Sequence, residues 1–376
     1  MAKLSLRLCL LAEIAACILV FPSESVKPTE KAALFVFGDS LFDPGNNQYI
    51  NGSSPGPSSH YPYGETFFKH PTGRVSDGRV VPDFIALFAN LPILPPYLQP
   101  GEHDFTLGIN FASAGARVLD LPHPGMAIDL HEQLSYFRKV AQSLRVKLGK
   151  VESKKLLMRA VYLFSIGGND YFSLSSNYPN TTLSYQREYV GMVIGNITDV
   201  LKEINELGGR KFAFQNAGPL GCTPGKRFEH HGVCDQLALA LAQRHNRLLA
   251  QALRIMEKNL HGFKYSIFDY YNALYDRINN PSKYGFKEGK GACCGTGDYR
   301  AFNCGVNNGT IKYDLCSDPS DFVWFDTAHT TENTNWQLAK LIWSGQGKIT
   351  GPYNVKQLFQ SHELRKQELV DELIFS

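Results

Sequence analysis

Hydrophobic positions along the chain follow two alternating patterns. Compact apolar runs, typical of buried strands, occur near residues 35–37, 108–111, 160–166, 211–216 and 264–269. Apolar positions at helical spacing lie near residues 81–88, 130–148, 184–207, 235–259 and from 331 onward. Strands that alternate with long helices predict an α/β fold, with a parallel sheet covered on both faces and functional loops along its carboxyl edge.

Local signals mark several element boundaries. Asp235 is the expected N-cap of the helix that reaches about Asn259, whereas Gly208 and Gly209 stop the helix before them. The Pro-, Gly- and Ser-rich segment 45–64 is an expected loop. The charged tail from Gln357 to Glu372 is expected to form a solvated amphipathic helix.

Length and composition indicate a single globular domain. The 376 residues, 43% of them hydrophobic, can bury about three quarters of their unfolded surface. No shift in composition divides them, so we expect one domain over residues 27–376. The formal charge of +3 is small and its basic residues are scattered, which argues against a nucleic-acid partner.

The first 26 residues have the layout of a secretory signal peptide. Lys3 and Arg7 precede the mostly apolar stretch 8–21, and a short Pro- and Ser-containing segment follows. This stretch is shorter than the about 20 residues that a bilayer span needs, and no later run is long enough. The sequence therefore predicts cleavage near residue 26, a secreted mature chain and no stable membrane span.

Cysteine usage agrees with export. Cys9 and Cys17 leave with the signal peptide, and the six that remain are Cys222, Cys234, Cys293, Cys294, Cys304 and Cys316. An even number in a secreted chain predicts disulfides, although six cysteines allow 15 pairings. We expect the local pair Cys222–Cys234, with the other four joining the Gly-rich segment 289–318.

Two other cysteine arrangements are disfavoured. The adjacent Cys293 and Cys294 are not expected to bond to each other. A zinc site built from His230, His231 and the cysteines matches no common ligand spacing. We therefore predict no metal.

Four asparagines begin an N-x-Ser/Thr sequence without a central proline. They are Asn51, Asn180, Asn196 and Asn308. In a secreted protein such residues are glycan acceptors where they are exposed. Asn196 lies in a predicted helix and is the weakest of the four.

The strongest chemical signal is the sequence "FVFGDSLFDPGNN" at residues 35–47. An apolar strand ends there at Gly38, Asp39 and Ser40. A serine just past a strand is held by the scaffold at the edge where ligands collect. Ser40 is therefore the candidate nucleophile.

A serine nucleophile needs a base and an acid that orients the base. The segment "VWFDTAHTTEN" supplies Asp326 and His329, three residues apart, so that one short turn can bring the carboxylate to an imidazole nitrogen. Asp39 is the less suitable acid, because adjacent side chains diverge on extended backbone; we expect it to accept backbone N–H groups and shape the turn. His245, in a predicted helix, is expected to be structural.

Two further segments suit an oxyanion hole, which needs fixed hydrogen-bond donors. "GINFASAG" ends at Gly115, where a backbone N–H can approach a ligand closely. "LFSIGGND" runs an apolar strand into Gly167, Gly168, Asn169 and Asp170.

Taken together and in this order, these four segments resemble the GDSL esterase/lipase family of plants, within the SGNH hydrolases. The resemblance spans nearly the whole mature chain and implies a flavodoxin-like three-layer α/β/α sandwich. On the family pattern Ser40 is the nucleophile, His329 the base and Asp326 its partner. Gly115 and Asn169 would be the backbone and side-chain oxyanion donors.

The chain departs from the family pattern at two positions. Family members often have Gly-Gly after the serine of the second block, where this chain has Ala114 and Gly115, and then Ala116 and Arg117. Many have proline after the catalytic histidine, where this chain has Thr330. Neither departure removes a reacting group, although the first leaves the identity of the oxyanion glycine open.

The implied reaction is hydrolysis of a carboxylic ester through an acyl-enzyme. The N–H groups of Ser40 and Gly115 and the Asn169 amide would stabilise the oxyanion, and no cofactor is required. The expected partner is an ester or lipid substrate. The resemblance also implies a location in the apoplast or cell wall and a role in lipid metabolism or plant defence. Two alternatives stay open: acyl transfer to another alcohol by the same triad, and a secreted binding protein without activity.

Other motifs carry less weight. Gly52, Ser54 and Gly56 match the G-x-S-x-G nucleophile elbow, but Pro55 and Pro57 block the helix that this elbow needs. "TPGKR" at residues 223–227 lacks the other residues of a phosphate loop. Four aromatic residues near Ser40 are candidates either for the wall of an acyl pocket or for the core: Phe42, Tyr61, Tyr63 and Phe67.

Overall fold

A computed structural model describes residues 31–50, 56–119, 125–306 and 312–360. The predicted signal peptide, the candidate glycan acceptors Asn51 and Asn308, and Ser54 of the elbow-like motif lie outside these residues. Chain contacts separate residues 1–31 from a second unit, Ala32–Ser376.

A six-stranded sheet forms the centre of this unit. Its strands are β1 (Leu34–Gly38), β2 (Gly108–Asn110), β3 (Val161–Ser165), β4 (Lys211–Gln215), β5 (Lys264–Phe268) and β10 (Thr350–Pro352). The order β10-β5-β4-β3-β1-β2 contains the 2-1-3-4-5 order of flavodoxin-like sheets. All neighbours pair in parallel except β10, which is antiparallel to β5. The predicted α/β class and parallel strands are confirmed, with one antiparallel edge added.

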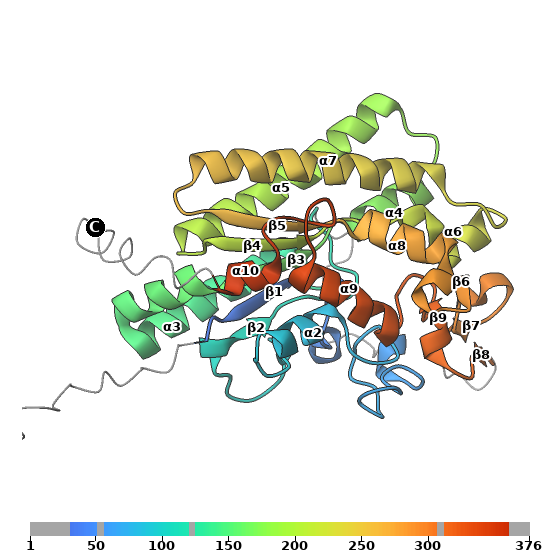
Figure 1. Cartoon of the computed structure of the whole chain (residues 1–376), viewed down its shortest axis with the longest axis horizontal. Helices are drawn as coiled ribbons and strands as arrows, with labels where there is room; N and C mark the ends of the chain where they lie inside the picture. The colour runs from blue at the N-terminus through green and yellow to red at the C-terminus, as the bar shows by residue number, and fades with distance from the viewer. Residues whose placement is uncertain (1–30, 51–55, 120–124, 307–311, 361–376) are drawn as a thin grey trace, which may run out of the picture. The chain divides into compact units, whose positions relative to one another are not determined.

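Helices cover both faces of the sheet (Figure 1). The longer ones are α2 (Val81–Phe88), α3 (Leu130–Arg159), α4 (Gly168–Asn177), α5 (Leu183–Glu206), α7 (Gln236–Asn259), α8 (Tyr270–Asn279) and α9 (Glu332–Ser344). Two short helices are α6 (Pro224–Glu229) and α10 (Val355–Gln360). Contacts link α3 with α5 and α5 with α7 on one face, and α2 with α9 and α9 with α10 on the other. The result is a three-layer α/β/α arrangement.

Paired aromatic rings on neighbouring strands form one layer of the core. Phe37 of β1 is in register with Phe164 of β3, and their rings stack with centroids 4.7 Å apart. Phe164 stacks in turn on Phe214 of β4 at 5.0 Å. Phe137 of α3 meets Phe37 edge to face at 5.8 Å, so this aromatic layer packs under α3. Cross-strand aromatic pairs of this kind stabilise a sheet in a defined register.

The predicted helix boundaries are largely confirmed. The Asp235 carboxylate accepts the N–H groups of Leu237 and Ala238 and caps α7. The helix predicted to end at Leu148 does end there, because Gly149, with φ at 82° and ψ at 166°, is not helical; after this break α3 continues to Arg159. Residues 357–360 are helical, as predicted, and belong to α10. They are not a solvated tail, because Leu358 is fully buried in the core. Residues 361–372 lie outside the described part.

Short secondary elements near the C-terminal part surround two of the disulfides. The strands β6 (Glu288–Ala292) and β9 (Phe322–Trp324) pair in parallel, and β7 (Cys294–Gly295) and β8 (Asp314–Leu315) pair antiparallel. The disulfides Cys293–Cys316 and Cys294–Cys304 join this segment, and Cys222–Cys234 lies at the start of α7. The predicted pair Cys222–Cys234 is confirmed, and Cys293 and Cys294 bond to different partners as expected.

Candidate active site

The candidate site lies at the point where the strand order of the sheet reverses. The strands β1 and β3 are neighbours, and the chain leaves them toward opposite edges, to β2 and to β4. Open α/β sheets bind ligands at such a switch point, outside the carboxyl ends of the strands. Ser40 follows β1 and Asn169 follows β3, so both candidates lie at this position.

Close approach of the two strand ends fixes the backbone around Ser40. The N–H of Asp39 donates to the carbonyl of Ser165 at 3.1 Å. A Cβ atom at Gly38 would lie only 2.5 Å from that same carbonyl oxygen, so glycine is required there. Gln133 of α3 then accepts the N–H of Gly38 at 2.9 Å and donates to its carbonyl at 2.8 Å. The turn that carries Ser40 is therefore held from two sides.

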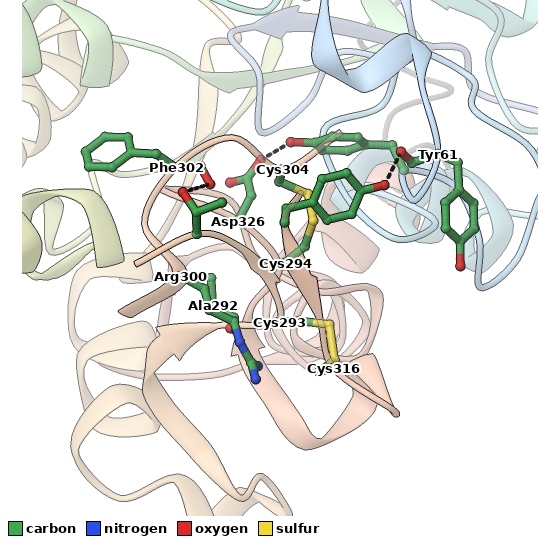
Figure 2. Close-up of a disulfide and its surroundings, with 12 residues drawn as sticks. Tyr61, Ala292, Cys293, Cys294, Arg300, Phe302, Cys304, Cys316 and Asp326 are labelled. Carbon is green, nitrogen blue, oxygen red and sulfur yellow. Dashed lines mark hydrogen bonds between the residues drawn. A yellow bond between two sulfur atoms is a disulfide. The ribbon is translucent and has the colours of Figure 1, made fainter. Parts of the chain in front are cut away.

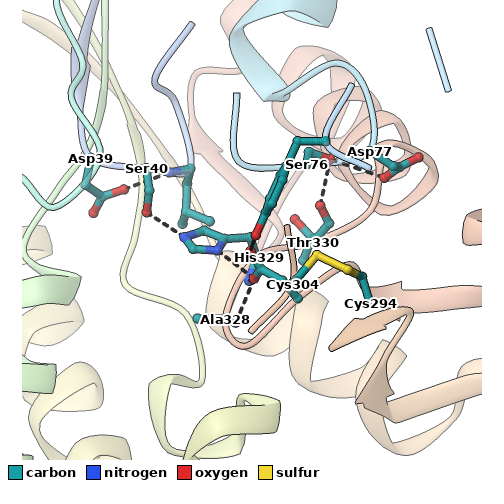
Figure 3. Close-up of polar contacts among 12 residues, drawn as sticks. Asp39, Ser40, Ser76, Asp77, Cys294, Cys304, Ala328, His329 and Thr330 are labelled. Atoms are coloured by element: carbon teal, nitrogen blue, oxygen red, sulfur yellow. Dashed lines mark hydrogen bonds and ion pairs between the residues drawn. A yellow bond between two sulfur atoms is a disulfide. The ribbon is translucent and has the colours of Figure 1, made fainter. Parts of the chain in front are cut away.

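Ser40, His329 and Asp326 form one hydrogen-bonded line. Figure 3 shows the bond between Ser40 and His329 as a dashed line. The Nε2 atom of His329 lies 2.8 Å from the Ser40 Oγ, and its Nδ1 atom lies 2.7 Å from an Asp326 carboxylate oxygen. Asp326 is buried, whereas Ser40 and His329 are half-buried. Serine and histidine are thus open to a substrate, while the acid is shielded from water.

A tight turn after β9 explains the three-residue spacing between the acid and the base. The Oδ1 atom of Asp326 accepts the N–H groups of Ala328 at 3.0 Å and His329 at 2.9 Å. The N–H of Phe325 donates to the His329 carbonyl at 2.7 Å. Thr330 is buried and donates its hydroxyl proton to Asn335 of α9 at 2.6 Å. The threonine therefore joins the turn to the helix that follows.

Electrostatics favour a histidine that accepts a proton readily. Burial lowers the pKa of His329, but the carboxylates of Asp326 and Asp39 outweigh this effect and hold that pKa above its usual value. Burial raises the pKa of Asp326. The neighbouring His329 and the hydrogen bonds to the carboxylate outweigh this effect and hold the pKa of Asp326 below its usual range. The acid thus stays ionised beside a strengthened base.

Asn169 lies at the start of α4 and points its side chain toward the loop after β2. Its Nδ2 atom donates to the Ala116 carbonyl at 2.9 Å. The buried carboxylate of the next residue, Asp170, accepts the N–H groups of Val118 and Leu119, both at 3.0 Å. The segment that contains Gly115 is therefore tied to α4 just beyond that glycine.

The structure brings three of the predicted site residues to one pocket. Ser40, Asn169 and His329 line it, whereas Gly115, with φ at 84°, is exposed and is not among the lining residues. Among the described residues, none accepts a hydrogen bond from the backbone N–H of Ser40 or of Gly115. Both groups are available as donors.

The pocket beside Ser40 is mainly apolar. Its cavity volume is about 140 Å³, below the roughly 300–1,000 Å³ that is usual for small-molecule sites. Its apolar walls come from the Ser40 turn, α4, the loop after β4, α8 and β9: Leu41, Phe172, Pro219, Leu220, Tyr270, Leu274 and Trp324. The arrangement can hold an apolar group next to a serine hydroxyl and a histidine.

The four aromatic residues near Ser40 do not form this pocket. Phe42 and Tyr63 are buried elsewhere, and Tyr61 and Phe67 are 60% and 45% exposed. Phe67 instead stacks on the guanidinium of Arg79. The pocket-wall alternative is therefore wrong for these residues. The actual walls come from segments distant in sequence, a grouping that no local pattern reveals.

Several residues that support the site were not identified from the sequence. Asp43 accepts the N–H groups of Gly45, Asn46 and Ala114 at 2.7–2.8 Å, and so links the loop after β1 to the loop after β2. Tyr63 donates its hydroxyl to the Oδ2 atom of Asp326 at 2.8 Å. The concentration of short polar residues after Ser40 was a usable signal for Asp43. Tyr63 gave none, because 263 positions separate it from its partner.

The remaining candidates have structural partners. Asp39 accepts the N–H of Leu41 at 3.1 Å, as predicted. His245 is buried on α7 and shares a hydrogen bond of 2.8 Å with the Tyr171 hydroxyl. Asn180 is exposed, whereas Asn196 is half-buried on α5, where its side chain contacts His131 and the Met192 carbonyl. Glycosylation of either residue stays a prediction.

Metal ligation and membrane spanning each need a recognisable grouping of residues. Within the described ranges, no group of three or more His, Cys, Asp or Glu side chains is placed to hold a metal ion. None of the helices in the same ranges combines the length and apolar character needed to span a bilayer.

Comparison with known proteins identifies the class and then the family. The model of the GDSL-like Lipase/Acylhydrolase family matches residues 34–342. GDSL esterase/lipase 1 of Arabidopsis thaliana is 50% identical over 345 residues, 88% of this chain and 91% of that protein. A GDSL lipase of Tanacetum cinerariifolium is 45% identical over 376 residues, 99% and 100% of the two chains. Fold, pocket and relatives together define a carboxylic ester hydrolase.

The chain belongs to the GDSL esterase/lipase family. More distant similarity extends to a protein of Arabidopsis thaliana named inactive GDSL esterase/lipase-like protein 25, which is 36% identical over 86% of this chain and 74% of its own length. Membership of the family therefore has to be combined with the geometry of the site before a mechanism is assigned.

Proposed function

We propose that this protein is a secreted serine esterase or lipase that uses Ser40, His329 and Asp326 as a catalytic triad. The observation that carries the proposal is the unbroken line of hydrogen bonds from Ser40 through His329 to Asp326, at 2.8 and 2.7 Å, beside an apolar pocket. Serine hydrolases on unrelated folds share this geometry.

In the proposed mechanism, His329 takes the proton of the Ser40 hydroxyl as its oxygen attacks the ester carbonyl. The tetrahedral intermediate collapses to an acyl-enzyme, and the alcohol leaves with the proton that His329 returns. Water then attacks the acyl group with His329 again as the base, and the acid is released. Asp326 stays ionised throughout and fixes the imidazole.

Three donors are assigned to the oxyanion hole: the N–H groups of Ser40 and Gly115 and the side-chain amide of Asn169. One proton of the Asn169 amide is used by the Ala116 carbonyl. That bond fixes the amide and leaves its second proton for the substrate. Preorganised donors of this kind stabilise charge that develops in the transition state.

The apolar lining of the pocket favours an acyl or aromatic group of the ester. Leu41 and Phe172, two half-buried residues of this lining, are available to contact that group. Export is supported by the three disulfides, which persist in oxidising compartments. A role in lipid metabolism or defence belongs to the proposal only as an implication of family membership.

The test is hydrolysis of p-nitrophenyl esters from acetate to palmitate by the disulfide-intact protein, beside Ser40→Ala and Ser54→Ala. The second variant removes the serine of the elbow-like motif and serves as the matched control. We expect loss of turnover in Ser40→Ala and unchanged turnover in Ser54→Ala. Activity that survives Ser40→Ala, or disappears in Ser54→Ala, would contradict the proposed nucleophile.

A further inference from the structure

The carboxylate of Asp326 has two oxygens with different partners. Its Oδ1 atom accepts from the His329 imidazole and from the two backbone N–H groups of the turn. Its Oδ2 atom accepts from the hydroxyl of Tyr63 at 2.8 Å. Among the described residues, no other donor to Oδ2 is present. Tyr63 is thus the one side chain outside the turn that fixes the plane of this buried carboxylate.

Tyr63 is itself held firmly. Its ring is 3% exposed and meets Phe325 edge to face, with centroids 5.2 Å apart. It packs in a small apolar cluster with Cys293, Cys294 and Cys304, separate from the main core. Figure 2 shows Asp326 and the Cys294–Cys304 disulfide together, with the hydrogen bond to Asp326 as a dashed line.

The disulfide-closed segment also limits movement of the ring. A Cβ atom at Gly305, next to Cys304, would lie 2.8 Å from the Tyr63 ring, so the backbone there is in direct contact with it. On the other side of Tyr63, the N–H of Gly64 donates to the Ser76 carbonyl at 3.0 Å. A ring enclosed in this way can present its hydroxyl in only one direction.

We propose that Tyr63 is a positioning residue of the triad: it orients Asp326 through a single hydrogen bond, with the Cys294–Cys304 segment as its support. This inference rests on the proposed function, because it acts through Asp326 and His329. Tyr63 does not line the pocket and therefore has no part in binding substrate.

The hydrogen bond has a defined electrostatic effect. A donor to a carboxylate withdraws part of its charge, so loss of the donor makes Asp326 more basic and strengthens its attraction for protonated His329. The titratable groups that face His329 are Asp326 and Asp39, and those that face Tyr63 are Asp326 and the neutral Tyr313. None of the others changes when the Tyr63 hydroxyl is removed.

The test is Tyr63→Phe, which keeps the ring and removes only the hydroxyl. We expect kcat to fall about tenfold, with KM nearly unchanged, because a charge-assisted hydrogen bond to the triad is lost. We also expect the acid limb of the pH profile of kcat/KM to move to higher pH. Tyr162→Phe is the matched control, since it removes another buried hydroxyl, one that donates to the Leu157 carbonyl away from the site.

Two results in Tyr63→Phe overturn the proposal. One is an unchanged kcat, and the other is a fall in kcat with an unmoved acid limb, which indicates a structural role only. If Tyr63→Phe does not fold, Gly305→Ala displaces the ring instead and should give the same upward shift; no shift overturns the proposal.

Ser40→Ala, run in parallel, separates the role of Tyr63 from the triad itself. An active Ser40→Ala refutes the triad and the positioning role together. An inactive Ser40→Ala beside a Tyr63→Phe variant with normal kcat refutes the role of Tyr63 alone.

Discussion

At the scale of single residues, Asp39 shows how burial changes a group that adjoins the nucleophile. Its carboxyl lines the pocket and is 5% exposed. Burial raises its pKa from 3.8 to about 7, against the opposing effects of the Leu41 N–H and of His329. The same carboxylate helps to raise the pKa of His329. Ionised Asp39 therefore destabilises the folded protein, while its negative charge raises the pKa of His329.

Asp39→Asn should change both stability and the pH profile. Between about pH 4 and 7 the folded wild type binds a proton that the unfolded chain has lost, so its free energy of unfolding falls as pH rises. The variant has no carboxyl at this position, so its free energy of unfolding does not fall in this way. Relative to wild type, that free energy should rise between about pH 4 and 7, by at most about 4 kcal/mol. The acid limb of kcat/KM should move to lower pH, because a negative charge near His329 is removed.

Urea unfolding at several pH values and a kcat/KM profile measure these two effects. Asp318→Asn is a suitable control, because hydrogen bonds from Ser320 lower the pKa of that exposed carboxyl and reverse the sign of the pH trend. A relative stability of Asp39→Asn that stays constant from pH 4 to 7 would show that Asp39 is not strained by burial.

Asn169→Ala removes the assigned side-chain donor to the oxyanion. Loss of one such donor typically lowers turnover about 100- to 1,000-fold, and we expect a fall of this size in kcat for p-nitrophenyl esters. Asn205→Ala is the matched control, because Asn205 also donates its amide to a backbone carbonyl, that of Gly209, but at the C-terminal end of α5. Nearly normal turnover in Asn169→Ala would remove this residue from the oxyanion hole.

At the scale of elements, two ten-residue helices form walls of the pocket. Phe172 lies on α4, and Tyr270 and Leu274 lie on α8. Only one or two residues separate each helix from the strand before it, and both helices are short, so a helical spacing of apolar residues has few turns in which to repeat. For this reason the hydrophobic periodicity did not predict either helix, and the pocket walls were missed with them.

Phe172→Ala should reduce affinity for apolar acyl groups. Burial of a large apolar side chain against ligand is worth about 1.5–3 kcal/mol, so we expect KM for butyrate and longer esters to rise about tenfold or more, while acetate changes little. Tyr178→Ala, at the exposed end of the same helix, is the control. An equal rise in KM for all chain lengths would place the acyl group elsewhere.

The Cys222–Cys234 disulfide ties the pocket loop to α7. Its two cysteines are 12 positions apart in the sequence. Next to the disulfide, the N–H of Asp235 donates to the carbonyl of Gly221. Loops of this size contribute about 3 kcal/mol when they are cross-linked. We expect Cys222→Ala/Cys234→Ala to lose about this much free energy of unfolding in urea. A loss of stability below about 1 kcal/mol would show that α7 packing alone holds the loop.

At the scale of the whole molecule, the sheet and the contact between Ser40 and His329 were the most predictable features. Ser40 follows an apolar strand, and His329 has an acid at the spacing of one turn, so both signals are local. The edge strand β10 contains Gly351 and Pro352 and has no strand-like sequence. It was not predicted, because its position depends on pairing with β5. The Tyr63 contact is equally invisible, since it depends on the tertiary fold alone.

The order of the site residues along the chain has a consequence for timing. Ser40 is made early, and its base His329 follows 289 positions later. At synthesis rates of about 5–20 residues per second, the nucleophile exists without its base for roughly a quarter of a minute to one minute. A nascent chain released anywhere before the turn at Asp326 carries the serine but no means of activating it. Under the proposed mechanism, the incomplete chain therefore cannot hydrolyse esters until His329 has been made and has folded against Ser40.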